Sequence, residues 1–193
     1  MWPLLLASIL SLAILLDRAR FLRRNRVVPP FLLDQVRARL LDGKREEALA
    51  YLRQDGSPMA RVLAAGVAAR ERRREVVRDR LEDAGRHQLP RLEAHLNTLG
   101  IIAGVSPLLG LLGTVSGMIK VFNTIAQQGV GQAGALAGGI SEALFSTAMG
   151  LLVAIPAFIA YRYFRHRAEV LAVEMERVAM ELLDFLTEQE APA

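Results

Sequence analysis

Two long apolar runs, each interrupted by a single charged residue, constrain the fold of this chain more than any other feature. Residues 99–125 contain one charge, Lys120, and residues 133–161 contain one charge, Glu142. A helix needs about 20 apolar residues to cross a bilayer, so each run is long enough. A charge placed there costs roughly 3 kcal/mol on insertion scales and usually faces a bundle interior or a water-filled path. The runs predict two transmembrane helices, with Glu142 as a candidate functional residue.

The composition agrees with a membrane protein that also has a charged extramembrane part. The chain has 193 residues, of which 52% are hydrophobic and 23% are charged, and the two kinds form separate blocks. It has no cysteine, which excludes disulfides and thiolate metal sites. Its three histidines (His87, His95 and His166) lack ligand-like spacing with carboxylates, so we predict no metal and no cofactor. The net charge of +4 agrees with the excess of Lys and Arg that membrane proteins carry next to their spans on the cytoplasmic side. It therefore does not predict nucleic-acid binding.

A shorter apolar run occupies residues 2–16, and five arginines follow it: Arg18, Arg20, Arg23, Arg24 and Arg26. A cleaved signal peptide carries its basic residues in front of the apolar run and has a small-residue cleavage site behind it. Neither feature is present here. We therefore expect a membrane anchor at residues 2–22, lengthened if Arg18 and Arg20 direct their charges to the membrane surface.

The basic residues predict the orientation of the spans, because Lys and Arg accumulate on the cytoplasmic side. Arg86 and Arg91 precede the second run, Arg162 and Arg165 follow the third, and residues 127–134 carry no charge. We expect a multi-pass arrangement with the N-terminus outside and the C-terminus inside. The expected segments are a transmembrane helix at 2–22, a cytoplasmic helical region at 23–92, a transmembrane helix at 93–125, a short periplasmic connection at 126–132, a transmembrane helix at 133–161 and a cytoplasmic C-terminal helix at 162–193.

The sequence predicts helices in the parts expected to be cytoplasmic. Gly56-Ser57-Pro58 predicts a break followed by an N-cap with proline in the first turn, and then a helix over residues 59–86. A second break or helix start is expected at residues 88–90. Beyond the third span, apolar residues recur with 4-3-4-3 spacing, which favours a continuing helix that packs on others: Leu171, Met175, Val178, Leu182 and Phe185.

Small and hydroxyl side chains form a stripe on each of the two long spans. Small residues let membrane helices pack closely, which is the role expected for Ser106, Gly110, Gly113, Gly117, Gly139 and Gly150. Hydroxyls can both donate and accept hydrogen bonds, so Thr114 and Thr147 are candidates for a proton pathway with Glu142. The alternative is that such hydroxyls bond only to their own helix backbone. For Ser146 we expect this alternative.

Residues 107–119 (PLLGLLGTVSGMI), residues 139–150 (GISEALFSTAMG) and Ile155-Pro156 closely resemble the ExbB/TolQ/MotA proton-channel family, its ExbB/TolQ branch most of all. The resemblance implies an all-helical, three-span subunit of a pentameric ring that encloses the single transmembrane helices of an ExbD/TolR-like partner. In that family the threonine of the G-T-V motif and the threonine five residues after the glutamate line the pore beside a partner aspartate. These threonines match Thr114 and Thr147, and the glutamate matches Glu142.

The function we expect is a proton-channel subunit of the bacterial inner membrane, in contact with lipid, that converts proton-motive force into mechanical work. The ExbB-like version acts with a TonB-like protein in uptake across the outer membrane. A TolQ-like subunit, acting with a TolA-like protein in envelope constriction, is the alternative. A non-conducting membrane scaffold is the alternative from another class. The chain is expected to be a stator rather than an enzyme, because the acid that carries the proton is expected on the partner. Its glycine-rich runs also lack the lysine and the preceding strand of a phosphate-binding loop.

Lys120 has no expected role in the family, so its position is argued from helix geometry. Suppose that Thr114 and Thr147 lie at one depth in antiparallel helices. Measured from the level of these threonines toward the outside, Lys120 is then about 9 Å away and Glu142 about 7.5 Å away. The two charges are then level within about 2 Å and can form an ion pair. Lys120 can instead extend its long stem to the outer surface. The sequence leaves both arrangements open.

Overall fold

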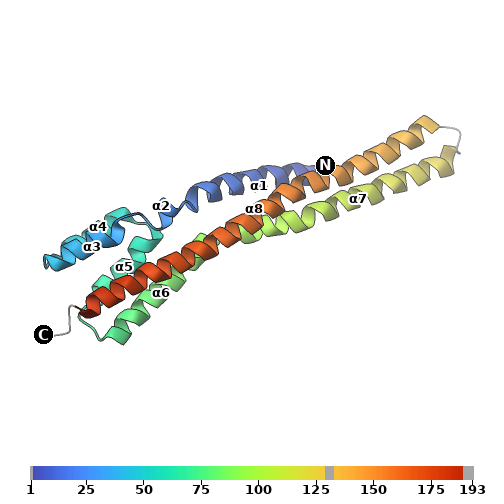
Figure 1. Cartoon of the computed structure of the whole chain (residues 1–193). Coiled ribbons are helices and arrows are strands. Elements are labelled where there is room, and N and C mark those ends of the chain that lie inside the picture. The colour runs from blue at the N-terminus through green and yellow to red at the C-terminus, as the bar shows by residue number, and fades with distance from the viewer. Residues whose placement is uncertain (1, 129–132, 189–193) are drawn as a thin grey trace. The chain divides into compact units, whose positions relative to one another are not determined.

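The computed structural model describes residues 2–128 and 133–188, and within these ranges it contains helices and no strand. The all-helical fold class is therefore confirmed. The helices are α1 (Trp2–Phe21), α2 (Arg24–Val27), α3 (Leu32–Leu41), α4 (Arg45–Asp55), α5 (Pro58–Ala68), α6 (Arg74–Leu92), α7 (Leu96–Gln128) and α8 (Ala133–Glu188) (Figure 1).

The chain divides into two compact units. The first, here called the apolar unit, contains the described residues up to Arg18 together with His95–Tyr163. The second, here called the polar unit, contains Ala19–Ala94 and the described residues from Phe164 onward. The 56 residues of α8 contribute to both units. A membrane crossing needs about 20 residues, so α8 is far longer than one crossing requires.

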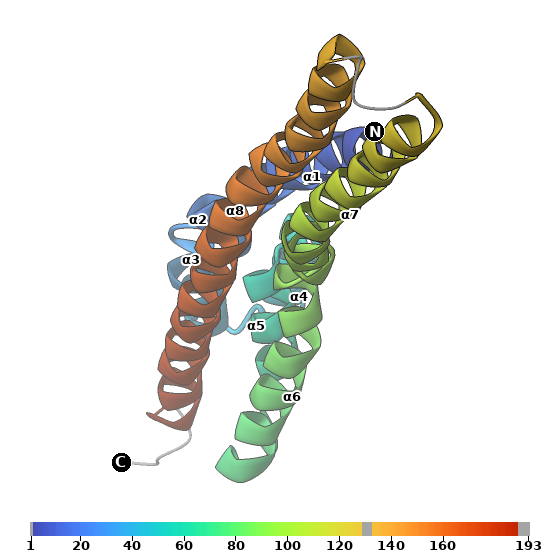
Figure 2. The same cartoon turned by 90° about the vertical axis from the view of Figure 1, so that its right-hand side faces the viewer.

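In the apolar unit, α7 and the first part of α8 lie side by side and run in opposite directions (Figures 1 and 2). Buried small residues line the seam between them, including Ser106 on α7 and Ala143 on α8. The other side of α7 is apolar and exposed. We call this exposed face the apolar stripe, and its 4-3 spacing runs through Ile101, Val105, Leu108, Leu112, Val115, Ile119 and Phe122.

An exposed apolar surface of this kind is typical of helices that face lipid or another subunit. By length and composition, two helical stretches of the described chain can cross a membrane. They are Arg74–Gln127, which includes α7 except its last residue, and Leu136–Glu188, which lies in α8. The predicted first span forms the 20-residue helix α1 but is not one of these two.

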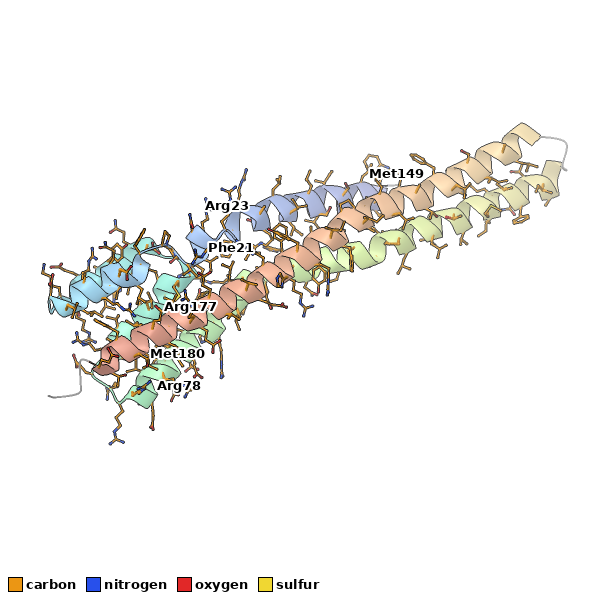
Figure 3. All side chains as sticks on the ribbon, viewed as in Figure 1. Phe21, Arg23, Arg78, Met149, Arg177 and Met180 are labelled. Atoms are coloured by element: carbon orange, nitrogen blue, oxygen red, sulfur yellow. The ribbon has the colours of Figure 1, made fainter. Side chains whose placement is uncertain are left out.

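The polar unit has its own core, built around α5 and the second half of α8. Leu63 and Val67 of α5 are fully buried, as are Leu171 and Leu182 of α8. Gly66 of α5 packs between leucines, since a Cβ atom there would lie 3.2 Å from a methyl carbon of Leu182. The predicted continuation of the third run into a packed helix is confirmed, because α8 is unbroken to Glu188. Surface positions of this unit carry charged side chains such as Arg78 and Arg177 (Figure 3).

The local signals between the helices are partly confirmed. Ser57 caps α5 as predicted, since its hydroxyl oxygen accepts a hydrogen bond of 3.1 Å from the backbone N–H of Ala60. The single helix predicted over residues 59–86 is wrong, because α5 ends at Ala68 and α6 begins at Arg74. The reason is tertiary. α5 and α6 pack against each other, so the chain must reverse at residues 69–73, four of which are charged.

The expected break at residues 88–90 is also displaced. Pro90 lies inside α6, and the break falls at residues 93–95, where His95 has a positive φ of 59°. The second long helix therefore begins at Leu96 rather than at residue 93, and it continues to Gln128, past the expected end at 125. The remainder of the predicted connection, residues 129–132, lies outside the described residues.

Candidate functional site

The seam between α7 and α8 is close because glycines on the two helices face each other. A Cβ atom on Gly150 would lie 2.7 Å from the backbone oxygen of Ser106 and 3.0 Å from the Cα atom of Gly110. Both clashing atoms belong to the backbone, so no side-chain rotation would relieve the overlap. Ser106 is itself fully buried, and its hydroxyl has no hydrogen-bond partner among the residues that the structure describes.

The other predicted packing residues occupy the same seam. A Cβ atom on Gly113 would lie only 1.8 Å from the hydroxyl oxygen of Ser146, so Ser146 fills the notch that Gly113 leaves. No hydrogen bond from Ser146 to its own helix is present in the described chain, which differs from the role expected for it. A Cβ atom on Gly117 would lie 2.8 Å from Ala143 Cβ, and a Cβ atom on Gly139 would lie 2.4 Å from Val121 Cγ2.

The structure brings Thr114 and Thr147 together at this seam. Their hydroxyl groups hydrogen-bond each other from opposite helices. Both hydroxyl oxygens also approach the backbone oxygen of Gly110, at 3.2 Å from Thr114 and 3.3 Å from Thr147. Thr114 has the backbone oxygen of Ala143 as a further acceptor at 3.4 Å. Both side chains are partly exposed, so a group beside the seam can reach them.

A count of hydrogens shows what this threonine pair can do. Two hydroxyls have two hydrogens, of which one serves the bond between the threonines and the other a backbone oxygen. Lone pairs on the hydroxyl oxygens remain available to accept a hydrogen bond from water or from a protonated carboxyl group. Rotation of one hydroxyl would turn the pair into a donor. The pair can therefore exchange hydrogen bonds with a proton-carrying group.

Glu142 is not bonded to either threonine. Its carboxylate Oε1 lies 3.7 Å from the ammonium Nζ of Lys120, and both side chains are largely exposed, at 72% and 68%. Among the described residues this ion pair is the interaction found for Glu142. The structure thus separates the predicted proton-pathway residues into a threonine pair and a charge pair.

The polar unit contains interactions that reasoning from the sequence did not find. The guanidinium of Arg24, in α2, donates from Nε to Glu174 Oε1 of α8 at 2.7 Å. This hydrogen bond lowers the pKa of Glu174 and raises the pKa of Arg24. No local spacing signals such pairs, since their members lie more than a hundred positions apart. Two further arginines donate hydrogen bonds to α8. Arg37 Nη2 donates to the backbone oxygen of Glu181 at 2.9 Å, and Arg74 Nη2 donates to Asp184 Oδ1 at 2.8 Å.

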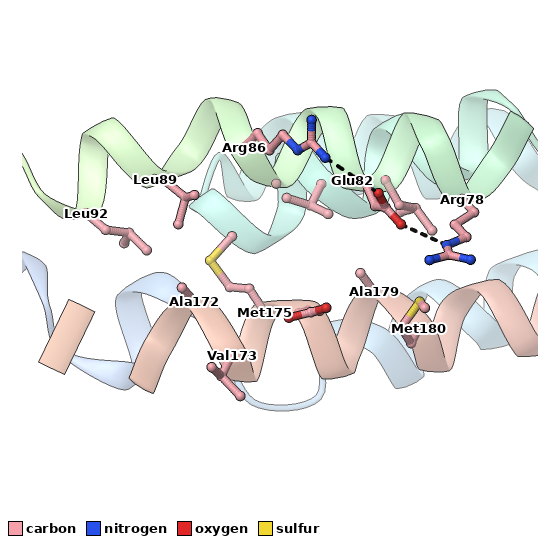
Figure 4. A pocket seen from close by; sticks show the side chains of 14 residues that line it. Arg78, Glu82, Arg86, Leu89, Leu92, Ala172, Val173, Met175, Ala179 and Met180 are labelled. Carbon is pink, nitrogen blue, oxygen red and sulfur yellow. Dashed lines mark hydrogen bonds and ion pairs between the residues drawn. The ribbon is translucent and has the colours of Figure 1, made fainter. Parts of the chain in front are cut away.

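A cavity of about 410 Å³ lies between α6 and the second half of α8 within the polar unit (Figure 4). Its walls are mostly apolar, with Leu89 and Met175 facing each other across it. At its edge the Glu82 carboxylate forms ion pairs with two arginines, at 2.8 Å from Arg78 Nε and 3.9 Å from Arg86 Nη2. No cluster of three or more His, Cys, Asp or Glu side chains able to hold a metal ion occurs in the described part of the chain.

The α7–α8 seam lies within a range of residues that matches a known family. The sequence profile described as the MotA/TolQ/ExbB proton channel family matches residues 54–177. This range contains both threonines of the pair as well as Lys120 and Glu142. The chain belongs to this family. The matched range also includes all of α5, α6 and α7, and α8 as far as Arg177.

Named relatives come from both the ExbB and the TolQ side of the family. A putative biopolymer transport protein, ExbB-like 3 of Synechocystis sp., is 37% identical over 171 residues, which cover 84% of this chain and 79% of the relative. The Tol-Pal system protein TolQ of Pseudomonas aeruginosa is 44% identical over 81 residues, 42% of this chain and 35% of TolQ. The biopolymer transport protein ExbB of Neisseria gonorrhoeae is 37% identical over 92 residues, 48% of this chain and 42% of that protein.

Proposed function

We propose that this chain is an ExbB-like proton-channel subunit of a bacterial inner membrane, which couples inward proton flow to mechanical work on a partner complex. The observation that carries the proposal is the hydrogen-bonded pair Thr114–Thr147 at the α7–α8 seam, inside the range that matches the family. A hydroxyl pair among apolar helices offers hydrogen bonds where lipid offers none.

The acid that carries the proton is proposed to belong to an ExbD/TolR-like single-span partner. Its protonated carboxyl group can donate to the threonine pair, and its carboxylate can accept from the pair after one hydroxyl rotates. Each proton that moves down about 150 mV releases roughly 3.5 kcal/mol. Several such steps supply enough energy to drive motion of the partner. In this role the chain is a stator without a cofactor or metal, not an enzyme.

The membrane arrangement that goes with this function has three spans, with the N-terminus outside and the C-terminus inside. α7 and the first part of α8 supply two spans. We propose that α1 supplies the third, since its 20 residues match the length that a bilayer requires. Labelling of single cysteines from each side of the membrane tests this orientation, with positions 3 and 130 expected outside and position 44 inside.

The assembly is proposed to be a ring of five subunits around the partner helices. The apolar stripe on α7 supports a helix-packing role, because its 4-3 spacing is that of a surface which packs against another helix. Native mass spectrometry of the purified protein should give a pentamer as the main species. A monomer or dimer as the main species would contradict the ring.

Proton flux into vesicles that contain the chain and its single-span partner tests the channel function directly. Thr147→Val keeps the shape of the side chain and removes the hydroxyl, so flux should fall at least about tenfold while the ring still assembles. Thr124→Val is the matched control. Within the described residues, the Thr124 hydroxyl bonds to the Lys120 backbone oxygen of its own helix, at 3.0 Å, so this change should leave flux within about twofold.

A TolQ-like role is the second candidate, favoured by the 44% identity to TolQ over 81 residues. The two roles differ in the downstream protein, which is TonB-like for uptake and TolA-like for envelope constriction. Co-purification with each kind of protein from the same bacterium separates them. A non-conducting scaffold would show unchanged flux for Thr114→Val and Thr147→Val, and that result would overturn the proposed function.

A further inference from the structure

The charge pair and the threonine pair lie on different sides of the α7–α8 seam. Along α7, Lys120 follows Thr114 by six positions, which turns it about 120° around the helix axis. Along α8, Glu142 precedes Thr147 by five positions, a turn of about 140°. Since Thr114 contacts Thr147 and Lys120 contacts Glu142, these turns carry both charges to the same flank. The two charges therefore lie on a different flank from the threonine hydroxyls.

Polar side chains continue along the flank of α7 that carries Lys120. Ser116, Lys120, Asn123 and Gln127 follow one another with 4-3-4 spacing, and all four are exposed. This polar line lies beside the apolar stripe on the same helix. Lys120 therefore has polar neighbours before and after it on α7, but Glu142 is the acidic group within ion-pair distance.

We propose that Lys120 is the counter-ion of Glu142 and holds its carboxylate on this flank. The inference rests on the membrane location proposed above, but it does not depend on proton conduction. An isolated charge in the hydrocarbon of a bilayer is costly, whereas two opposite charges at equal depth compensate each other. Lys120 is thus a positioning residue that acts through Glu142. The alternative, in which Lys120 extends to the outer surface, would leave Glu142 without its partner.

The pair has a thermodynamic signature that packing alone cannot produce. Removing one member leaves the other charge unpaired, whereas removing both leaves neither. In the full-length protein, purified as its complex, Lys120→Met should lower the apparent melting temperature by about 4 °C or more. The double change Lys120→Met with Glu142→Gln should recover at least half of that loss. Equal losses in the single and double variants, or no loss in Lys120→Met, would overturn the proposal.

Charge-conserving and charge-reversing variants distinguish an ion pair from a general effect at position 120. Lys120→Arg should retain the melting temperature of the unmodified protein, because the positive charge remains. Lys120→Glu should lower it more than Lys120→Met does, and adding Glu142→Lys should restore it. Failure of this exchange to restore stability would count against the pair.

Asn123→Leu is the matched control, since it removes a polar group one turn away on the same flank and leaves the charges unchanged. It should shift the melting temperature by less than about 1 °C. If Lys120→Met yields no folded protein, recovery of expression by the double variant supports the pair, and its failure to recover refutes the pair. Loss of flux in the threonine variants is measured separately, so the two proposals can fail independently.

Discussion

Thr114 and Thr147 hydrogen-bond each other across the α7–α8 seam, although 33 positions separate them in the chain. The backbone oxygen of Gly110 lies within 3.3 Å of both hydroxyls, so three groups from two helices meet at one point. The contact is possible because Gly110 has no side chain. The hydrogen bonds at the seam therefore depend on the two threonine hydroxyls and on the distance between the two helices.

Hydroxyl chemistry should be separable from side-chain shape. Thr114→Ser keeps the hydroxyl and removes one methyl group, whereas Thr114→Val keeps the shape and removes the hydroxyl. Proton flux should remain within about threefold of the unmodified protein for the serine variant and fall at least about tenfold for the valine variant, as expected for loss of a group active in proton transfer. Equal flux through both variants would show that the hydroxyl has no part in conduction.

Gly150→Ala should destabilise the apolar unit. The added Cβ atom would lie 2.7 Å from the backbone oxygen of Ser106, and overpacking of this kind costs about 1–3 kcal/mol. The measurement is the melting temperature of the purified protein. Gly138→Ala is the control on the same helix, because a Cβ atom there has no neighbour within 4 Å among the described residues, and it should be neutral or slightly stabilising.

Stability of the polar unit should depend on pH through Glu174. The hydrogen bond from Arg24 lowers the pKa of Glu174 in the folded protein. Its contribution to stability is therefore complete above the ordinary glutamate pKa near 4.5 and is lost as the pH falls through the lower pKa of the folded state. Unfolding followed from pH 7 down to pH 3 should show a smaller loss of stability for Glu174→Gln than for the unmodified protein.

Glu169→Gln is the comparison for that measurement. Glu169 is paired with Arg165 one turn away on α8, and its side chain is 59% exposed, against 16% for Glu174. An exposed pair one turn apart contributes little. The pH profile of this variant should follow that of the unmodified protein. Identical profiles for all three proteins would contradict the role given to Glu174.

Leu182→Ala should unfold the polar unit at lower denaturant concentration. The side chain is fully buried, and deleting such a leucine side chain costs about 2–5 kcal/mol. Val173→Ala, at a position on α8 that is 66% exposed, should change stability by less than about 0.5 kcal/mol. Equal effects of the two changes, measured by circular dichroism of the full-length protein, would show that α8 does not form part of this core.

Much of the apolar unit follows from the sequence alone. Lipid permits only segments that satisfy their own backbone hydrogen bonds, so an apolar run as long as residues 133–161 can form little other than a helix. The small residues on both long helices also predicted where they pack, because position on a helix follows from spacing. The threonines and Glu142 were recognised from the motifs that contain them.

The tertiary structure decided which side chains meet. Spacing along one helix says nothing about the register between two helices, so the ion pair Lys120–Glu142 followed from the sequence only if the two threonines lay level. The turn at residues 69–73 depends on α5 packing against α6, and it overrode a local preference for one continuous helix. The bond from Arg24 to Glu174 joins residues 150 positions apart. Local propensity cannot specify contacts between such distant residues, because only the packed helices bring them within reach.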